Sequence, residues 1–180
     1  MMRAIGLAFV LGLAVVWWDP AGLRWAGAAG ASVGAVLVLF RFATAARRRA
    51  ARRTLEGLRA MAPEAFEAEV AVWLRRDGWR VERTGGPRDG GVDLVARRGR
   101  ETAFVQCKRL GEGGTVGAST VRDLYGAAVA GGATLAVLVT TGRVSPAARE
   151  WAGGLAGTPR MVVVDASLVT DVAGGRPLLG

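Results

Sequence analysis

The apolar residues of this 180-residue chain follow two different patterns. Residues 4–18 and 25–40 are long apolar runs without a charged side chain, and the segment DPAGLR separates them. From about residue 54 onward, shorter apolar segments follow helical and strand periodicities. The chain is therefore expected to have an apolar N-terminal part and a folded C-terminal part.

Helices and strands are predicted to alternate in the C-terminal part. Residues 63–78 place Phe66, Val70 and Leu74 on one helical face. The elements expected after this helix are strands at 79–83, 92–97 and 102–108, a helix at 120–130, a strand at 134–141, a helix opening at Ser145-Pro146, and a strand at 160–166. This order predicts one α/β domain with a mixed sheet.

The two apolar runs predict a transmembrane helical hairpin over residues 1–42, with spans at about 4–18 and 25–40. Six arginines lie in residues 41–53, and the positive-inside rule places them in the cytoplasm together with both termini. The prediction is a multi-pass protein of the bacterial cytoplasmic membrane, in which an Arg-rich linker at 43–59 contacts the lipid bilayer and the folded C-terminal domain lies in the cytoplasm. A cleaved signal peptide and a buried core hairpin are the alternatives.

Composition excludes several kinds of chemistry. The chain has no histidine, no asparagine and a single cysteine, so catalytic triads, zinc fingers and histidine-metal nucleases are excluded. Of the net charge of +9, residues 41–53 contribute +6, whereas residues 54–180 contribute only about +2. The basic character is therefore weak evidence for a DNA-binding surface.

A tight hairpin is expected between the second and third strands of the folded part. With Gly99 and Arg100 as the two turn residues, Asp93 lies directly opposite Gln106. Alternation then places Asp93, Gln106 and Lys108 on one face of the hairpin. A carboxylate, an amide and an ammonium group are thus expected to converge.

This set of groups suits Mg²⁺, which binds carboxylate and carbonyl oxygens and keeps positions open for phosphate oxygens. Such a metal polarises a phosphodiester and helps to generate hydroxide. Lys108 is the only lysine in a chain with 23 arginines. Its compact ammonium group can orient the attacking water or offset charge on the phosphate, and its pKa can be lowered, whereas arginine stays protonated. The pattern predicts metal-dependent hydrolysis of phosphodiesters.

Two stretches, EAFEAEVAVWLRRDGWRVERTGGPRDGGVDLVARRGRETAFVQCKR and VRDLYGAAVAGGATLAVLVTTGRVSPAAREWA, resemble the catalytic domain of Mrr-type restriction endonucleases, a branch of the PD-(D/E)xK nuclease superfamily. The resemblance covers about residues 60–165 and depends on FE, on GGVD and on the spacing D-x12-Q-x-K. It implies a restriction-endonuclease-like mixed β-sheet flanked by helices. It also implies a nuclease domain at 60–176 with a type IV restriction-like activity on foreign or modified DNA.

The same resemblance implies the residues of the active site. In that family the glutamate of FE, the strand aspartate and the Q-x-K pair form a metal-dependent site, and they correspond here to Glu67, Asp93, Gln106 and Lys108. Glu67, Asp93 and Gln106 are then the expected Mg²⁺ ligands. Much of the wider superfamily has Asp or Glu in place of Gln106, so Glu67 would restore the second negative charge. Asp89 is expected to form a turn, and support of the site is its alternative role.

DNA is the expected partner. Phosphate contacts are expected from the face that carries the site. The candidates are Arg83 and Arg88 nearby, Lys108 and Arg109, and Arg122 or Arg143 at helix starts. One site cuts one strand, so a homodimer is expected for a double-strand break. One alternative is a catalytically inactive nuclease-fold module that serves as a membrane-tethered DNA-binding or scaffold protein. The other is a different hydrolase, or a nuclease that cuts RNA, on the same fold.

Overall fold

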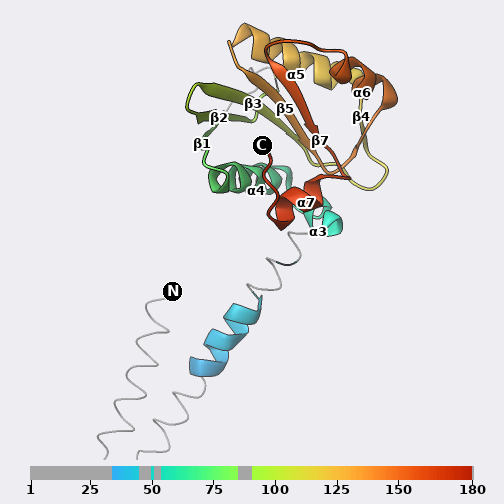
Figure 1. Ribbon diagram of the computed structural model, residues 1–180. Coiled ribbons are helices and arrows are strands. Elements are labelled where there is room, and N and C mark those ends of the chain that lie inside the picture. Colours follow the sequence, from blue (N-terminus) through green and yellow to red (C-terminus); the bar gives the residue numbers. More distant parts are fainter. Residues whose placement is uncertain (1–33, 45–49, 51–53, 85–90, 180) are drawn as a thin grey trace, which may run out of the picture. The chain divides into compact units, whose positions relative to one another are not determined.

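The computed structural model describes residues 34–44, 50, 54–84 and 91–179. The chain divides into two units, Met1–Ala50 and Ala51–Gly180. Of the first unit, the structure describes a helix over residues 34–44, drawn in blue in Figure 1. All the other helices and strands described below belong to the second unit.

The predicted membrane hairpin meets a contrary finding. Within the described parts of the chain, no helix is both long enough and apolar enough to cross a bilayer. This finding contradicts the predicted multi-pass location in the cytoplasmic membrane. The predicted span at 4–18, and residues 25–33 of the second span, lie outside the described residues.

A five-stranded mixed sheet forms the centre of the second unit (Figure 1). Its strands are β1 (Arg80–Arg83), β2 (Leu94–Arg98), β3 (Glu101–Lys108), β5 (Leu135–Thr140) and β7 (Arg160–Val164). They lie in the order β1-β2-β3-β5-β7; the first two pairs are antiparallel and the last two are parallel. The predicted α/β domain with a mixed sheet is confirmed.

One face of the sheet is covered by α4 (Pro63–Arg76), the helix predicted at 63–78. Phe66, Val70 and Leu74 recur every four residues and are fully buried in one core cluster with Val105 of β3. Pro63 occupies the first turn, where its missing N–H leaves no bond unmade. The apolar periodicity of this segment therefore fixes which side of α4 faces the sheet.

The other face is covered by α5 (Ala118–Ala130) and α6 (Pro146–Gly153). Leu124 of α5 and Leu138 of β5 are fully buried in this second core cluster. All six residues of β5 are buried, because helices cover the central parallel strand on both sides. As predicted, α6 opens at Ser145, whose hydroxyl accepts a bond from a backbone amide of the first turn.

The β2–β3 hairpin has the predicted turn. Leu94 pairs with Val105 and Arg98 pairs with Glu101, which leaves Gly99 and Arg100 as the turn residues. Gly99 has φ +59°, the conformation that a type II′ turn requires at its first central position.

Four short elements were not predicted. They are α3 (Leu55–Arg59), β4 (Thr115–Val116), β6 (Arg143–Val144) and α7 (Val169–Gly174). β4 and β6 pair in parallel and form a separate two-stranded sheet. The glycine-rich segment before α5 is thereby fastened to the chain that follows β5.

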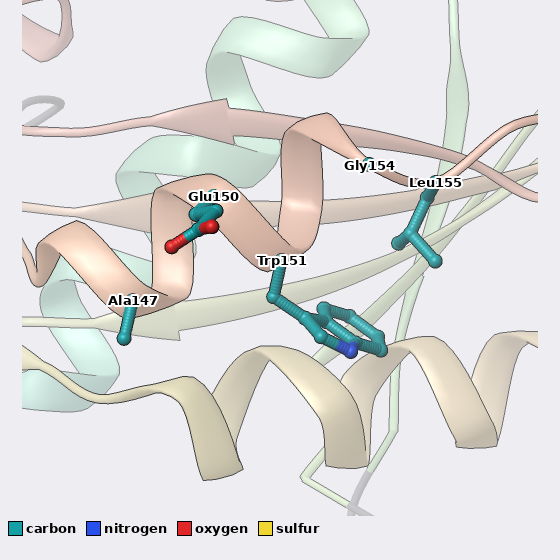
Figure 2. A pocket seen from close by; sticks show the side chains of 5 residues that line it. All are labelled: Ala147, Glu150, Trp151, Gly154 and Leu155. Carbon is teal, nitrogen blue, oxygen red and sulfur yellow. The ribbon is translucent and has the colours of Figure 1, made fainter.

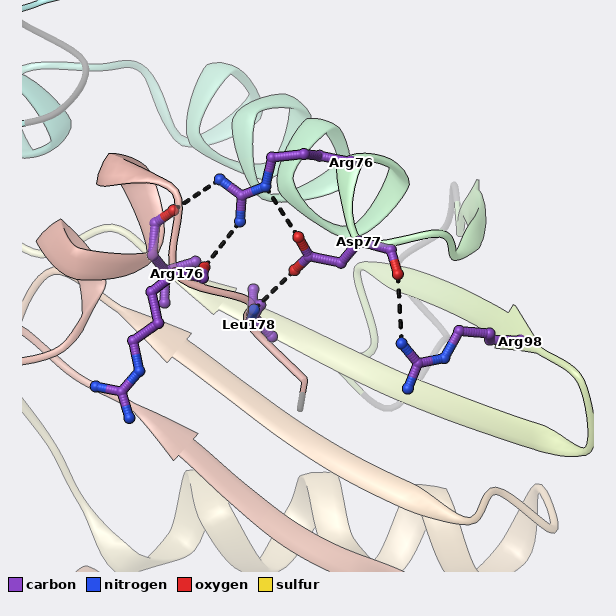
Figure 3. A network of polar contacts seen from close by, with 6 residues as sticks. Arg76, Asp77, Arg98, Arg176 and Leu178 are labelled. Atoms are coloured by element: carbon purple, nitrogen blue, oxygen red, sulfur yellow. Dashed lines mark hydrogen bonds and ion pairs between the residues drawn. The ribbon is translucent and has the colours of Figure 1, made fainter.

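Polar bonds tie the C-terminal segment to the end of α4 (Figure 3). The guanidinium of Arg76 donates to the carbonyls of Val172 and Arg176 at 3.0 and 2.8 Å. The carboxylate of Asp77 accepts from the amide of Leu178 at 2.7 Å. These bonds hold Leu178 in the core beside α4, so the helix that carries Glu67 is fixed at its far end.

Candidate functional site

The four residues expected at the site lie at neighbouring positions in the fold. Glu67 lies on α4, and Asp93 immediately precedes β2. Gln106 and Lys108 lie within the last three residues of β3. α4 packs against β1, β2 and β3. The charges of Glu67 and Lys108 both act on Asp93, so these three ionisable groups lie within electrostatic range of one another.

The backbone departs from regular pairing at Asp93. In a regular ladder Asp93 would face Gln106, but its amide donates to the carbonyl of Val105 at 2.9 Å. Val105 is already the partner of Leu94, so two residues of one strand face one residue of the other, as in a β-bulge. The predicted direct pairing of Asp93 with Gln106 is therefore wrong, and the bulge re-aims the Asp93 side chain.

The Asp93 carboxylate is held against β3. Its Oδ2 atom accepts a bond from the backbone amide of Cys107 at 2.6 Å. Burial raises the pKa of Asp93 above its ordinary value of 3.8, and the negative charge of Glu67 adds to that effect. The Cys107 bond and the charges of Lys108 and Arg83 oppose it without cancelling it. A desolvated carboxylate of this kind gains from a nearby cation.

Glu67 is already engaged by an arginine. Nη2 of Arg83, at the end of β1, lies 2.7 Å from Oε2 of Glu67. The two side chains are 21% exposed for Glu67 and 48% exposed for Arg83, so water screens the pair only partly. Arg83 was expected to contact DNA, and its pairing with Glu67 was not predicted. Only Oε2 takes part in this pair, and Oε1 has no hydrogen bond or ion pair with any residue in the described ranges.

Gln106 is a buried polar residue with an unmade bond. It is 6% exposed, and its Oε1 atom has no hydrogen-bond partner among the described residues. Its Nε2 atom lies against Gly91, where a Cβ would come within 2.5 Å of it. A buried carbonyl oxygen without a partner is costly, and it is suited to an ion or a water molecule.

Lys108 ends β3 at the edge of the sheet. Its carbonyl accepts the Thr140 hydroxyl at 2.7 Å and the Thr141 amide at 3.3 Å. Its side chain is exposed and forms no hydrogen bond or ion pair with any residue in the described ranges. The backbone of Lys108 is therefore fixed while its ammonium group is free to meet a ligand.

The residues at the site fit Mg²⁺ as an open site. Within the described ranges no cluster of three His, Cys, Asp or Glu side chains is present. Two carboxylates, from Asp93 and Glu67, and the unpaired Oε1 of Gln106 remain as oxygen donors. Mg²⁺ is commonly held by one or two carboxylates, with water and substrate phosphate completing its octahedron. The oxygen donors of Asp93, Glu67 and Gln106 match this coordination preference of Mg²⁺.

The other candidates are one carboxylate and four arginines. Asp89 and Arg88 lie outside the described residues. Nε of Arg109 is buried and finds no partner in the described part of the chain, while Arg122 and Arg143 are exposed. Within the described ranges, no hydrogen bond or ion pair joins Arg109, Arg122 or Arg143 to the four-residue site.

A separate pocket of about 510 Å³ lies beside α6 (Figure 2). Trp151 points from α6 toward α5, where it packs edge-on against Tyr125 with ring centroids 5.5 Å apart. Glu150 is the one charged residue of its lining. A pocket with a carboxylate and no cation is unsuited to a phosphate, so it is not part of the proposed nuclease site.

The sequence profile of the Mrr_cat family, described as "Restriction endonuclease", matches residues 58–172. The chain belongs to this restriction endonuclease family. The predicted resemblance of the folded domain to Mrr-type enzymes is thereby confirmed.

Individual relatives agree with this family. The chain is 35% identical over 123 residues to the type IV methyl-directed restriction enzyme EcoKMrr of Escherichia coli K12, a match that covers 64% of this chain and 39% of that protein. It is 45% identical over 60 residues to a UPF0102 protein of Rhizorhabdus wittichii, covering 33% and 49% of the two chains. The matches span less than half the length of these curated relatives.

Among solved structures, the DNA modification-dependent restriction endonuclease AspBHI is similar with a TM-score of 0.56 and 25% identity. The similarity covers 73% of this chain and 37% of AspBHI. The mixed sheet with flanking helices is thus the fold of restriction endonucleases.

Proposed function

We propose that this protein cleaves DNA phosphodiester bonds in a Mg²⁺-dependent reaction at Glu67, Asp93, Gln106 and Lys108. The observation that carries the proposal is the unpaired, buried Oε1 of Gln106 in a fold where Glu67 and Lys108 both act on the desolvated Asp93. A buried carbonyl oxygen without a partner is costly, and a divalent cation held by carboxylates can relieve that cost. Membership of the restriction endonuclease family supports the nuclease assignment.

Each residue has a distinct role in this proposal. Asp93, Glu67 and Gln106 would hold Mg²⁺, and the bound ion would polarise the phosphodiester and lower the pKa of a water molecule. The Cys107 amide keeps the Asp93 carboxylate in place. Lys108 orients the attacking water or offsets the negative charge that develops on the phosphate.

The test is cleavage of supercoiled plasmid by the full-length protein. We expect nicking with Mg²⁺ and none with EDTA, and we expect Lys108→Ala and Asp93→Asn to lose activity by about 100-fold or more. Arg160→Gln is the matched control, because Arg160 is exposed at the amino end of β7, away from the site. Folded wild-type protein that nicks no faster than Lys108→Ala would reject the proposal and favour the catalytically inactive module.

A second measurement does not depend on turnover. Mg²⁺ should raise the melting temperature of the wild-type protein and should not raise that of Asp93→Asn, because ligand binding stabilises only the folded state that holds it. Side-by-side cleavage of DNA and RNA distinguishes the RNA-cutting alternative.

Substrate choice and assembly extend the proposal. Both EcoKMrr and AspBHI carry names that specify modified DNA. We expect methylated plasmid to be cut faster than unmethylated plasmid. We also expect a homodimer, which would convert nicked circles to linear DNA; sedimentation that finds only monomers while linear DNA accumulates would contradict the dimer.

A further inference from the structure

A second charged pocket lies near the same edge of the sheet as Lys108. It has a volume of about 420 Å³, and its lining includes Arg59 of α3, Arg143 of β6 and Arg149 of α6. Asp165, which follows β7, is the single acidic residue of the lining. The pocket therefore gathers three guanidinium groups around one carboxylate and keeps an excess of positive charge.

The carboxylate of Asp165 is occupied by bonds from the protein. Oδ1 accepts from the amide and the hydroxyl of Ser167 at 2.9 and 2.6 Å, and Oδ2 accepts from the guanidinium of Arg149. The side chain is 4% exposed. Burial alone would raise the pKa of Asp165, but these hydrogen bonds outweigh it and lower that pKa. Asp165 thus serves to hold Arg149 rather than to repel an anion.

The other two arginines keep donors free. Nε of Arg59 donates to the Thr141 carbonyl at 3.2 Å, which anchors the side chain and leaves its two terminal nitrogens without a bond to the rest of the described chain. Arg143 is exposed, and its side chain bonds to none of the described residues. Its backbone is fixed, because its amide donates to Gly114 at 2.9 Å and β6 pairs with β4. Forked guanidinium donors in a fixed frame match the oxygens of a phosphate.

Strand register sets the distance from this pocket to the candidate active site. Lys108 pairs with Thr140, and Val139 pairs with Val164, so Asp165 follows on the line that continues from Lys108 through Thr140. Two strand spacings separate Lys108 from Asp165, which is about 10 Å. DNA rises about 3.4 Å per nucleotide along the helix axis, and phosphates of one strand lie farther apart than this rise because the strand also winds around the axis, so this distance corresponds to at most about three nucleotides.

We propose that the Arg59–Arg143–Arg149 pocket binds a backbone phosphate of the DNA strand whose scissile phosphate lies at Lys108. This inference rests on the proposed nuclease function and adds the position of a second phosphate. A free phosphate ion has the same chemistry, and DNA is favoured because parallel strands bring both sites to one edge of the sheet.

The experiment measures DNA binding by full-length protein in EDTA, so that cleavage plays no part. Fluorescence anisotropy of a labelled duplex is recorded from about 0.05 to 0.2 M salt for wild type, Arg143→Gln and the control Arg160→Gln. One lost phosphate contact lowers the slope of log K against log[salt] by about 0.9, which at 0.1 M salt weakens binding on the order of eightfold. We expect this loss in Arg143→Gln and not in Arg160→Gln. Arg143 has no structural bond to lose, so both variants should fold.

The possible outcomes separate this inference from the nuclease assignment. Equal binding by Arg143→Gln and Arg160→Gln, with wild-type nicking intact, would overturn the pocket assignment alone. A folded wild-type protein that neither binds nor nicks DNA would overturn both. Inorganic phosphate provides the remaining arm: if it raises the melting temperature of wild type but not of Arg143→Gln, while both bind DNA alike, the pocket takes free phosphate and the DNA assignment is wrong.

Discussion

The contact between Gly91 and Gln106 offers a sharp test of the candidate site. Gly91 has φ +80°, and a Cβ built on it would lie 2.5 Å from Nε2 of Gln106. Contacts that close do not occur between a Cβ and a nitrogen, so Gly91→Ala must displace the Gln106 amide. If Oε1 of that amide supports a metal, the substitution disturbs the site without touching a charged residue.

Two effects of Gly91→Ala have different sizes. A left-handed backbone costs a non-glycine residue about 1–2 kcal/mol. For a domain of this size that lowers the melting temperature by roughly 3–10 °C. Displacing a group that supports a metal site lowers metal affinity or activity by about 10–100-fold. This loss of metal affinity or activity is larger than the loss of activity that partial unfolding causes well below the melting temperature.

Gly99→Ala is the matched control. Gly99 also has positive φ, +59°, but nothing lies within 4 Å of a Cβ built there. We expect both variants to lose comparable stability in thermal melting. Only Gly91→Ala should lose plasmid nicking and the Mg²⁺-induced rise in melting temperature, measured at least 10 °C below either melting point. A Gly91→Ala variant that nicks as fast as Gly99→Ala would refute the role assigned to Gln106.

Three further predictions concern single charges. Burial raises the pKa of Asp93, so ionisation of its carboxyl lowers the free energy of unfolding. This loss is complete above the folded-state pKa and absent below about pH 3.8. Asp93→Asn should therefore melt higher than wild type in EDTA near pH 7, and the difference should vanish toward pH 3.5; a lower melting point near pH 7 contradicts this. Despite burial, hydrogen bonds from Ser167 and Arg149 lower the pKa of Asp165, so their stabilisation is present above pH 3.8 and lost as the pH falls through the folded-state pKa. Asp165→Asn should melt lower than wild type near pH 7, and the difference should shrink as the pH falls below 3.8. Arg83→Gln should free Glu67 and tighten Mg²⁺ binding by about two- to fivefold in calorimetry, the size expected for a half-exposed ion pair; weaker binding would show that Arg83 supports the site.

Local rules were sufficient for the hairpin and for the helix that carries Glu67. The turn at Gly99 and Arg100 and the pairing of Leu94 with Val105 follow from strand periodicity and turn chemistry, and both are present. The bulge at Asp93 was beyond such rules. It arises from one backbone hydrogen bond between the Asp93 amide and the Val105 carbonyl, and the alternation of side chains in the sequence does not predict that bond. The GG that precedes Asp93 was the one local hint of irregular backbone.

The remaining departures from prediction depend on contacts between distant segments. The Glu67–Arg83 pair joins α4 to β1 across 16 residues, and the Arg59 bond to Thr141 spans 82. Sequence periodicity relates residues three to four positions apart in helices and two positions apart in strands. It therefore contains no information on pairs of residues that are distant in the sequence. Short elements such as α3 and α7 are also below the length at which periodicity can be recognised.

The spacing between the candidate active site and the arginine pocket depends on β5. This strand pairs in parallel with β3 on one side and with β7 on the other, and all its residues are buried. A one-residue slip of either pairing would turn every side chain of the slipped strand to the opposite face, which a strand packed on both faces resists. The line from Lys108 through Thr140 to Asp165 is therefore held by the core itself. The net charge of the domain could not have revealed this arrangement, because the domain as a whole is nearly neutral. The positive charges lie together at one edge of the sheet, where the arginine pocket is a fixed distance from Lys108.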